Sequence, residues 1–363
     1  MIKHIQEIGP SKVIQLYFPV SDFHAIVVVD NTALGPSIGG VRVSRNVTVE
    51  EVKRLARTMT LKTSIAGLPH GGGKAGIIAD PQDPKKELYF RIFSQAIKDL
   101  TDYIPGPDMG SDEECMAWIH DEIGRVAGLP EEIGGLPLDK LGATGFGLAE
   151  CAEIACNYAN LELNGAKVAV QGFGSVGKAA ASFLSEKGCV LIAASDTKGC
   201  IFNANGIDVK DLIDIKENTG SVINYTKGGL KSSEEIFSFE CDILIPAATP
   251  DVIHKGNAEN IKAKLILQGA NIPATLEAEE ILHKKNVLSV PDFIANAGGV
   301  IMAAAEYAKK SEDEAFNAIS EKIKKNTKVI LENTFQEGIL PRQAAEKIAK
   351  ERVLKAMSYK KTL

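Results

Sequence analysis

Two lysines, a run of glycines and an aspartate in the first third of the chain are the residue types suited to acid–base chemistry. Lys62 precedes the run Gly71–Gly73, Lys74 follows it directly, and Asp108 closes a segment of glycine and proline. Two ammonium groups that lie close together disfavour double protonation, so one could act as a general base while the other holds a carboxylate. Asp108 would then carry protons. Singly, each residue fits a surface lysine, a turn or a helix cap, and only the combination indicates a reaction.

A second motif, further along the chain, predicts a dinucleotide site. The pattern Gly-x-Gly-x-x-Gly follows a predicted strand and opens a predicted helix, and it consists of Gly172, Phe173, Gly174, Ser175, Val176 and Gly177. Its glycines permit a tight turn, a close approach of backbone to pyrophosphate, and close packing of helix on strand. Asp196, at the end of the next predicted strand, would accept hydrogen bonds from both ribose hydroxyls. This favours NAD, although Lys198 lies close enough to leave NADP possible.

Composition sets the broad class of the protein. The chain has 363 residues, 45% of them hydrophobic and 24% charged, which is ordinary for a globular protein of about two domains. A net charge of -6 gives no reason to expect nucleic acid or an acidic membrane surface as a partner. Residues 1–7 lack the pattern of a signal peptide, and the cysteines form no Cys-x-x-Cys pair. We therefore expect a cytoplasmic protein with reduced thiols and no metal site.

The first 138 residues are expected to mix strands and helices. The predicted elements are a strand at 25–29, a helix at 49–64, a strand at 75–79, and helices at 87–100 and 112–126. Thr48 and Glu51 have the spacing of a capping box at the start of the first helix. Lys62 then lies near the end of that helix, and Lys74 lies in a glycine loop before the second strand.

The second half of the chain has the pattern of a doubly wound α/β domain. Short apolar strands, typical of a buried parallel sheet with helices on both faces, are predicted at 167–170, 190–193, 242–245, 264–267 and 287–290. A glycine- and proline-rich stretch at 128–137 is predicted to be the crossing between domains. We expect an N-terminal α/β domain at 1–138, against which helices at about 325–363 pack back, and a Rossmann-type domain at 139–324.

Several ordered motifs resemble those of the amino-acid dehydrogenases that act on glutamate, leucine, phenylalanine and valine. The motifs, which span nearly the whole chain, are Leu34–Arg42, Met59–Lys62, Gly71–Lys74, Asp108, Ala143–Gly147, Gly172–Gly177, Pro246–Ala248, Gly269–Asn271 and Asn296–Val300. The resemblance implies two domains with a cleft between them, of which the first builds a homo-oligomer, a hexamer or an octamer. It also implies oxidative deamination of an L-amino acid to a 2-oxo acid and ammonia, with NAD or NADP as acceptor.

The resemblance assigns a role to each candidate residue. Lys62 is similar in place to the lysine that holds the substrate α-carboxylate, Lys74 to the lysine that activates water, and Asp108 to the aspartate that shuttles protons to and from the amine. The expected cofactor contacts are Thr144, the six residues from Gly172 to Gly177, Asp196, Ala247, Asn271 and Asn296. The last of these is expected near both the nicotinamide and the substrate.

Two positions indicate which amino acid is used. Glutamate enzymes of the family carry a lysine before the paired glycines Gly39 and Gly40, where this chain has Ile38, and a serine where it has Ala303. An unpaired buried carboxylate is costly, so an apolar side chain against Ile38, Val300 and Ala303 is favoured. The length of the chain also resembles that of leucine dehydrogenases. We therefore expect a branched-chain or other apolar substrate.

Two alternatives remain open at the level of sequence. A glutamate dehydrogenase would need another cation for the γ-carboxylate, and Arg42 and His70 are the nearby candidates. A catalytically silent NAD-binding sensor would need no acid–base residues, so the joint presence of Lys62, Lys74 and Asp108 argues against it.

Overall fold

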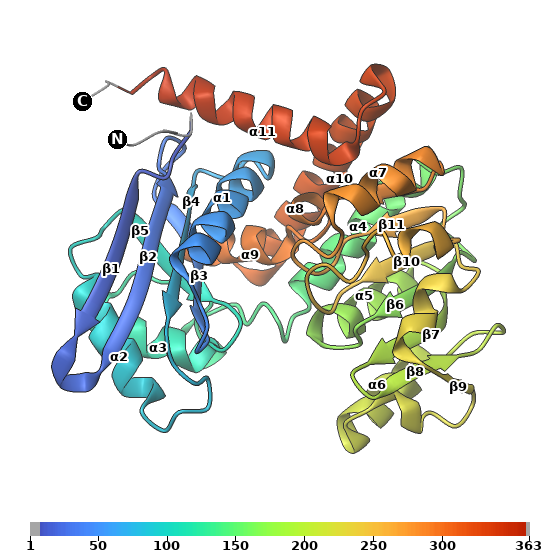
Figure 1. Cartoon of the computed structure of the whole chain (residues 1–363), viewed down its shortest axis with the longest axis horizontal. Helices are drawn as coiled ribbons and strands as arrows, with labels where there is room; N and C mark the ends of the chain where they lie inside the picture. Colours follow the sequence, from blue (N-terminus) through green and yellow to red (C-terminus); the bar gives the residue numbers. More distant parts are fainter. Residues whose placement is uncertain (1–7, 361–363) are drawn as a thin grey trace. The chain divides into compact units, whose positions relative to one another are not determined.

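The computed structural model describes residues 8–360, which form two compact units (Figure 1). The first unit contains the chain as far as Leu138, together with Val300–Ala318 and the chain from Glu346 onward. The second contains Asp139–Gly299 and Ile319–Ala345. Residues 1–7, on which the argument about a signal peptide rests, lie outside the described part. The predicted domain limits, 1–138 with 325–363 and 139–324, stay a prediction.

The first unit is built on a mixed sheet with helices on both faces. Its elements are β1 (Lys12–Phe18), β2 (Phe23–Asn31), β3 (Ser37–Val43), α1 (Val49–Ile65), β4 (Gly71–Ile77), α2 (Lys86–Ala96), β5 (Tyr103–Pro107) and α3 (Glu113–Ile123). The strand order is β1-β2-β4-β3-β5. Strand β2 runs antiparallel to β1 and β4, whereas β3 runs parallel to β4 and β5. The carboxyl ends of β3, β4 and β5 therefore meet at one edge of the sheet.

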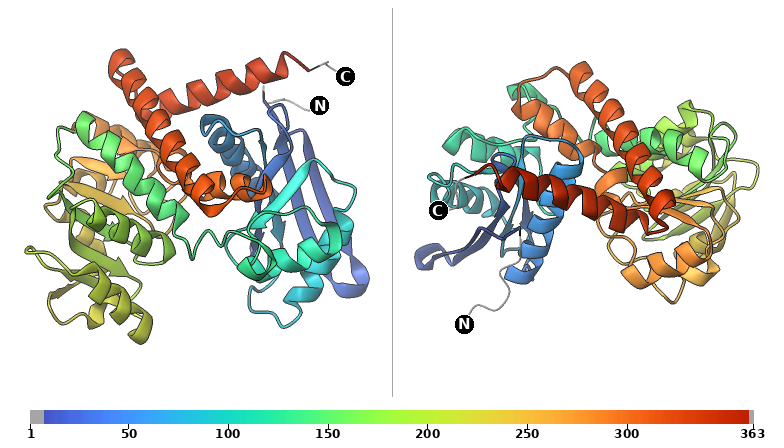
Figure 2. Two further views of the ribbon diagram at one scale, coloured as in Figure 1. Left: turned by 180° about the vertical axis from the view of Figure 1, so that it is seen from behind. Right: turned by 90° about the horizontal axis from the view of Figure 1, so that it is seen from above.

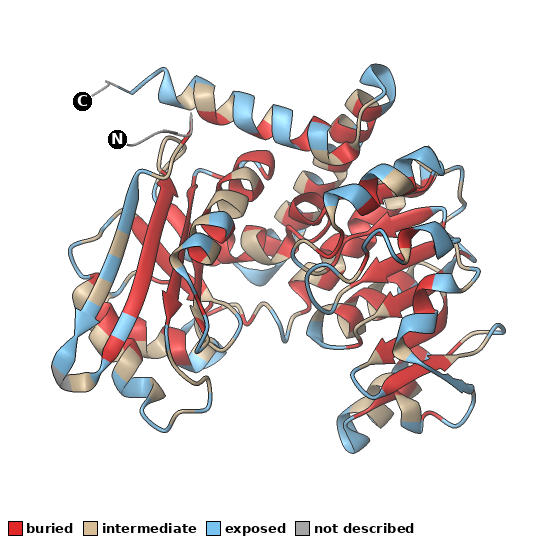
Figure 3. Cartoon of the chain, viewed as in Figure 1, coloured by how far each residue is buried: buried red, intermediate tan, exposed pale blue. Residues whose placement is uncertain are grey.

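Alternation along β2 explains why this sheet is covered on both faces. Phe23, Ala25, Val27 and Val29 pack with buried residues of α2 and α3, whereas Ile26 and Val28 pack with Val52 and Ala56 of α1. Successive side chains of a strand point to opposite faces, so an uninterrupted apolar run suits a strand that is buried on both sides. Figure 3 shows this strand as buried along most of its length, with an exposed residue, His24, near its start.

The glycine run before Lys74 is part of a strand, so the predicted glycine loop is wrong. Strand β4 includes Gly71, Gly72 and Gly73, and the sheet and α1 approach it closely. A Cβ on Gly72 would lie 2.1 Å from the backbone nitrogen of Thr60 on α1. The glycines are required here by close packing, because residues with side chains would push the helix away.

The second unit is a Rossmann-like α/β domain. Its elements are α4 (Ala143–Tyr158), β6 (Lys167–Gln171), α5 (Ser175–Glu186), β7 (Val190–Asp196), β8 (Gly199–Phe202), α6 (Val209–Thr219), β9 (Gly229–Lys231), β10 (Ile243–Pro246), β11 (Leu265–Leu267), α7 (Leu276–Lys284), β12 (Leu288–Val290) and α8 (Asp292–Ala295). The strand order is β12-β11-β10-β6-β7-β8-β9, parallel from β12 to β7. The five predicted strands are confirmed, and β8 and β9 extend the sheet in antiparallel fashion.

Small residues let α4 lie directly against α5 in this domain (Figure 2). A Cβ on Gly145 would lie 2.4 Å from the backbone nitrogen of Ala180. Helices α9 (Gly298–Tyr307), α10 (Glu312–Glu337) and α11 (Pro341–Met357) complete the chain, as the helical pattern after Asn296 predicts. Within residues 8–360, no helix is long and apolar enough to cross a membrane. The same residues contain no group of three or more histidine, cysteine or acidic side chains placed to hold a metal ion.

Candidate active site

The glycine motif of the second unit forms a turn between β6 and α5 whose three glycines have different surroundings. Gly172 has a φ of +91°, which disfavours any residue with a side chain. A Cβ on Gly174 would meet nothing within 4 Å, so the backbone is open to a ligand at this point. A Cβ on Gly177 would lie 2.1 Å from the carbonyl oxygen of Gly172, so this glycine permits the helix to pack on the turn. This combination fits a pyrophosphate at the start of α5.

The other residues of the turn lie in the same structure. Phe173 is fully buried, and its backbone N–H donates to the carbonyl of Ser195 at 2.8 Å. Ser175 and Val176 form the first turn of α5. The backbone N–H of Ala247, which follows β10, donates to the carbonyl of Gln171 at 2.7 Å, beside the turn.

Asp196 ends β7, as predicted, but its carboxylate already has partners within the protein. Lys216 on α6 donates to Oδ2 at 2.7 Å, Ser221 contacts both oxygens, and the backbone N–H of Val222 and of Lys198 each donate to one. Burial opposes ionisation, but these hydrogen bonds outweigh it and hold the pKa of Asp196 below its ordinary value. The carboxylate is therefore charged, and Lys216 is its paired cation.

Asn296 is held in an orientation that leaves an acceptor unused. Its side-chain N–H groups donate to the carbonyls of Gly269 and Ala270 at 3.1 Å and to Oδ1 of Asn271 at 3.3 Å. Its own Oδ1 is buried and has no hydrogen-bond partner among the described residues. A buried acceptor of this kind fits the amide N–H of a nicotinamide. Thr144, the remaining predicted cofactor contact, lies in the first turn of α4.

A buried polar network supports the loop that carries Asn271. Arg342, in the first turn of α11, donates to Glu279 at 2.8 Å and to Asp292 at 3.2 Å. Asp292 in turn accepts the backbone N–H of Ile272 at 3.1 Å, and Ile272 has a φ of +51°, which is rare for a β-branched residue. The network stabilises a strained backbone next to the cofactor residues.

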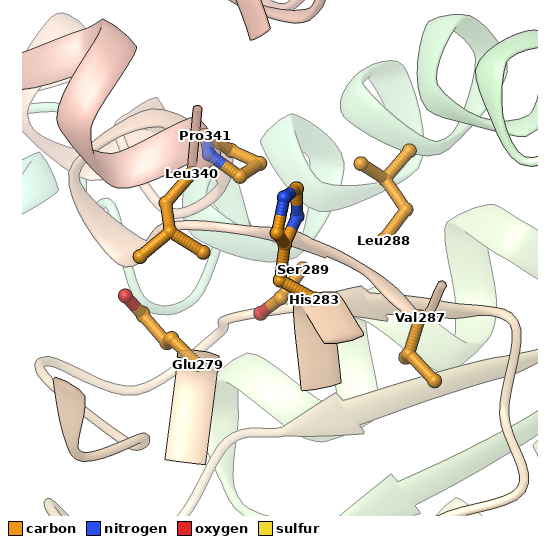
Figure 4. A pocket seen from close by; sticks show the side chains of 7 residues that line it. All are labelled: Glu279, His283, Val287, Leu288, Ser289, Leu340 and Pro341. Atoms are coloured by element: carbon orange, nitrogen blue, oxygen red, sulfur yellow. The ribbon is translucent and has the colours of Figure 1, made fainter. Parts of the chain in front are cut away.

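A small hollow lies beside this network (Figure 4). It is lined by Glu279, His283, Val287, Leu288, Ser289, Leu340 and Pro341, none of which is a predicted site residue.

In the first unit, the register of the sheet brings the predicted acid–base residues together. Val41 on β3 has one register partner on β4 and another on β5. Lys74, Arg42 and Asp108 are each the neighbour in sequence of one of these three paired residues, so they lie close together on adjacent strands. Lys74 Nζ lies 3.0 Å from Asp108 Oδ2, and both side chains are largely buried. A Cβ on Gly40 would lie 2.6 Å from the Cβ of Asp108, so a glycine at position 40 makes room for this carboxylate.

Asp108 has a second cationic partner, Arg42, and no motif in the sequence indicates this pairing. The Nε of Arg42 donates to the same Oδ2 at 2.9 Å, and Arg42 NH1 donates to Glu51 at 2.6 Å. Burial would raise the pKa of Asp108, but the charges of Lys74 and Arg42 outweigh it and hold that pKa below its ordinary value. Asp108 is therefore a carboxylate, able to accept a proton.

Lys62 lies in the last turn of α1 and is buried. The helix begins where predicted, because the Thr48 hydroxyl accepts the backbone N–H of Glu51 at 3.2 Å. The carboxylate of Glu51 pairs with Arg42, so the capping box is formed only in part. Gly39, between Ile38 and Gly40, packs so tightly that its Cβ would lie 1.7 Å from the carbonyl oxygen of Gly73.

The residues predicted to contact the substrate side chain belong to one apolar cluster in the first unit. The cluster consists of Ile38, Ile104, Ala127 and Ala303, with Met59, Leu138 and Val300 packed against them. Ile38 and Ala303 were predicted from the family pattern, whereas Met59 and Leu138 were missed because they come from segments far apart in the chain.

Neither candidate cation for a γ-carboxylate is free to bind one. Arg42 is engaged by Asp108 and Glu51. Burial lowers the pKa of His70, whose Nδ1 lies 3.2 Å from the carbonyl of Pro36 and whose ring packs edge-on against Tyr307. His70 is therefore neutral near pH 7.

Comparison with known proteins shows likeness along almost the whole chain. Residues 134–361 match the family model "Glutamate/Leucine/Phenylalanine/Valine dehydrogenase", and residues 10–125 match "Glu/Leu/Phe/Val dehydrogenase, dimerisation domain". Glutamate dehydrogenase of Aeropyrum pernix is 42% identical, over 91% of this chain and 85% of the relative. NADP-specific glutamate dehydrogenase of Saccharolobus shibatae is 39% identical over 90% and 82%, and NAD-specific glutamate dehydrogenase of Staphylococcus aureus is 34% identical over 97% and 91%.

A solved structure shows the same likeness in three dimensions. The hetero-hexameric glutamate dehydrogenase from Thermus thermophilus, in a leucine-bound form, superposes with a TM-score of 0.89 at 29% identity and covers 98% of this chain and 91% of its own. All four proteins are named as glutamate dehydrogenases, and none as a leucine dehydrogenase. They therefore do not support the expected likeness to leucine dehydrogenases in particular.

Proposed function

The chain belongs to the glutamate/leucine/phenylalanine/valine dehydrogenase family and is an amino-acid dehydrogenase, and from that premise we propose which residues perform the reaction and on which substrate. The single observation that supports the assignment of roles is the buried pair of Lys74 and Asp108, with Nζ and Oδ2 3.0 Å apart. An ionised carboxylate can carry a proton, and a lysine side chain beside it can hold and orient a water molecule.

The proposed reaction converts an L-amino acid, water and NAD(P)⁺ into a 2-oxo acid, ammonium, NAD(P)H and a proton. Lys62 holds the α-carboxylate, and Asp108 accepts a proton from the substrate ammonium so that the nitrogen lone pair can form the C=N bond. A bound nicotinamide would supply the acceptor for the hydride on Cα. Lys74 orients the water that adds to the iminium carbon. Asp108 then returns its proton to the departing ammonia. The two protons that this water loses on its way to the carbonyl oxygen pass to solvent, where one of them converts the released ammonia to ammonium.

The apolar cluster supports an apolar side chain, branched or aromatic, on the substrate. Glutamate would bring its γ-carboxylate against the apolar side chains of Ile38 and Ala303. Leaving such a charge unpaired in a buried place costs several kcal/mol, by an order-of-magnitude estimate. The geometry of these residues therefore favours an apolar amino acid.

Glutamate is the second candidate, and relatedness favours it over the apolar substrate. The curated relatives at 34–42% identity named above are all glutamate dehydrogenases. If the protein shares their substrate, the γ-carboxylate must find a partner other than Arg42 and His70.

For the cofactor, we propose NAD as the preferred acceptor and NADP as an accepted one. Asp196 stands at the end of β7, where a carboxylate selects the unphosphorylated ribose. Lys216, 2.7 Å from Asp196, weakens that selection because it offsets the carboxylate's charge. We further propose that the first unit assembles a homo-oligomer, in keeping with the matched dimerisation domain and the hexameric relative.

The test is reductive amination by the purified protein, followed by loss of NADH absorbance. Ammonia is supplied with 4-methyl-2-oxopentanoate, phenylpyruvate or 2-oxoglutarate in parallel. A higher kcat/KM with either of the first two supports the apolar substrate. A preference for 2-oxoglutarate would replace it with glutamate, and failure with all three while NADH still binds would contradict the proposed reaction.

A further inference from the structure

Arg42 is a buried cation in contact with the acid–base pair, to which the proposed reaction gives no role. It lies near the end of β3, and its side chain is 13% exposed. Its guanidinium forms two separate ion pairs, one through Nε to Asp108 and one through NH1 to Glu51. A planar guanidinium that uses two edges at once is fixed in orientation, which a lysine could not reproduce.

We propose that Arg42 is a positioning residue of the reaction: it binds Oδ2 of Asp108 beside Lys74, so that Oδ1 is the oxygen that exchanges the proton with the substrate amine. This inference rests on the proposed function. Lys74 Nζ and Arg42 Nε both contact Oδ2, at 3.0 and 2.9 Å. The two cations therefore converge on Oδ2, and Oδ1 is the oxygen that we assign to the proton transfer.

The fold fixes this arrangement from two sides. Val41 and Pro107 are register partners, so Arg42 and Asp108 extend from adjacent positions on neighbouring strands. Glu51 holds the other edge of the guanidinium from the first turn of α1, where Thr48 caps the helix. Arg42 thus cannot swing away from Asp108 without breaking a second ion pair.

The two cations around Asp108, Lys74 and Arg42, favour its ionised form. Lys74 and Arg42 contribute positive charge from β4 and β3, and Glu51 lies beyond Arg42. Tyr103 on β5 is fully buried, and burial together with the charge of Asp108 raises its pKa, so it stays neutral and donates to the carbonyl of Gly39 at 2.7 Å. Removing Arg42 leaves Lys74 as the cation in contact with Asp108.

The experiment is a pH profile of oxidative deamination for the wild type, R42Q and R42K. R42Q keeps a hydrogen-bond donor of similar length but removes the charge. We expect kcat to fall roughly tenfold or more, because a positioned proton acceptor contributes about 10²–10⁴-fold. The acid limb of kcat/KM is expected to move to higher pH, because Asp108 gains protons more readily without Arg42. R42K is expected to restore the position of the limb and only part of the rate.

Two control variants separate positioning from a structural role. E51Q removes the other ion pair of Arg42 and leaves Asp108 untouched, and R45Q removes a nearby arginine whose ion pair with Asp80 is largely exposed. We expect the acid limb to stay in place in R45Q and to move less in E51Q than in R42Q, because Arg42 keeps its contact with Asp108 in E51Q but loses its second ion pair. If R42Q leaves the limb unmoved, or if E51Q moves it as far as R42Q does, Arg42 serves only to hold the strand and the proposal is wrong.

A readout that needs no turnover distinguishes this proposal from the proposed function. The infrared difference spectrum between the wild type and D108N reports protonation of Asp108 as pH is varied. The corresponding difference between R42Q and R42Q/D108N should titrate at higher pH. An unchanged titration would overturn the role of Arg42, whatever the substrate. A shifted titration in a protein that oxidises no amino acid would sustain the role of Arg42 and refute the proposed reaction.

Discussion

Replacing Gly40 by alanine should slow the reaction strongly, while the protein remains folded. The added Cβ would lie 2.6 Å from the Cβ of Asp108 and 2.6 Å from the carbonyl oxygen of Pro107, whereas ordinary contact begins at 3.4 Å. Asp108 must therefore move by roughly 0.8 Å, and a displacement of about 1 Å at a reacting group costs about 10²-fold in rate. Overpacking of this size costs about 1–3 kcal/mol of stability.

The matched control lies directly across the sheet. Gly106 on β5 is the register partner of Gly40 on β3, and a Cβ at Gly106 would meet only the carbonyl oxygen of Ala127, at 3.7 Å. The assay is kcat for NADH formation from the preferred amino acid, with thermal unfolding measured in parallel. We expect about a hundredfold loss for G40A and less than threefold for G106A, following the same displacement argument. Equal kcat values for G40A and the wild type would refute the placement of Asp108 against Gly40.

Three further predictions concern the second unit and the charge of Asp108. R342M leaves the buried carboxylate of Glu279 without its cation and should lower the free energy of unfolding by about 3–5 kcal/mol in urea titrations; a loss below about 1 kcal/mol would show that the pair contributes little. K216M uncovers the carboxylate of Asp196 and should reduce kcat/KM for NADP relative to NAD by about tenfold, the effect of one charge-assisted hydrogen bond; a ratio that moves toward NADP would contradict it. The folded-state pKa of Asp108 lies below its unfolded value, so its contribution to stability is present above about pH 4 and is lost as pH falls through the folded pKa. Denaturation of D108N should accordingly depend less on pH in that range than denaturation of the wild type, and identical pH dependence would argue against the charge assigned to Asp108.

Local patterns explain why much of the fold was predictable from the sequence. The cap at Thr48, the apolar spacing of α1 and the strand–turn–helix around Gly172 are each decided by neighbouring residues. By contrast, β3 contains two glycines, and β5 contains glycine and proline, which favour turns by composition. Strand β4 begins with three glycines. Those segments become strands because partners distant in the chain leave no room for side chains.

The same distinction, between local patterns and partners distant in the chain, applies to the site. Lys74 and Asp108 were expected to act together because each suits one part of a known reaction, and their contact is observed. The partners of these groups were not foreseen. Arg42 reaches Asp108 through the register of β3 and β5, and Lys216 reaches Asp196 from α6. Neither pairing has a fixed spacing in the sequence, so only the folded structure reveals it.

Turnover of K74A measures the central claim most directly. The variant and the wild type would be compared for NADH formation, with binding of NADH followed by fluorescence to show that the second unit remains intact. We expect a loss of kcat of roughly 10³-fold or more with NADH binding unchanged, because Lys74 pairs with Asp108 and is the residue proposed to act on the water. Turnover at the rate of the wild type would contradict the mechanism.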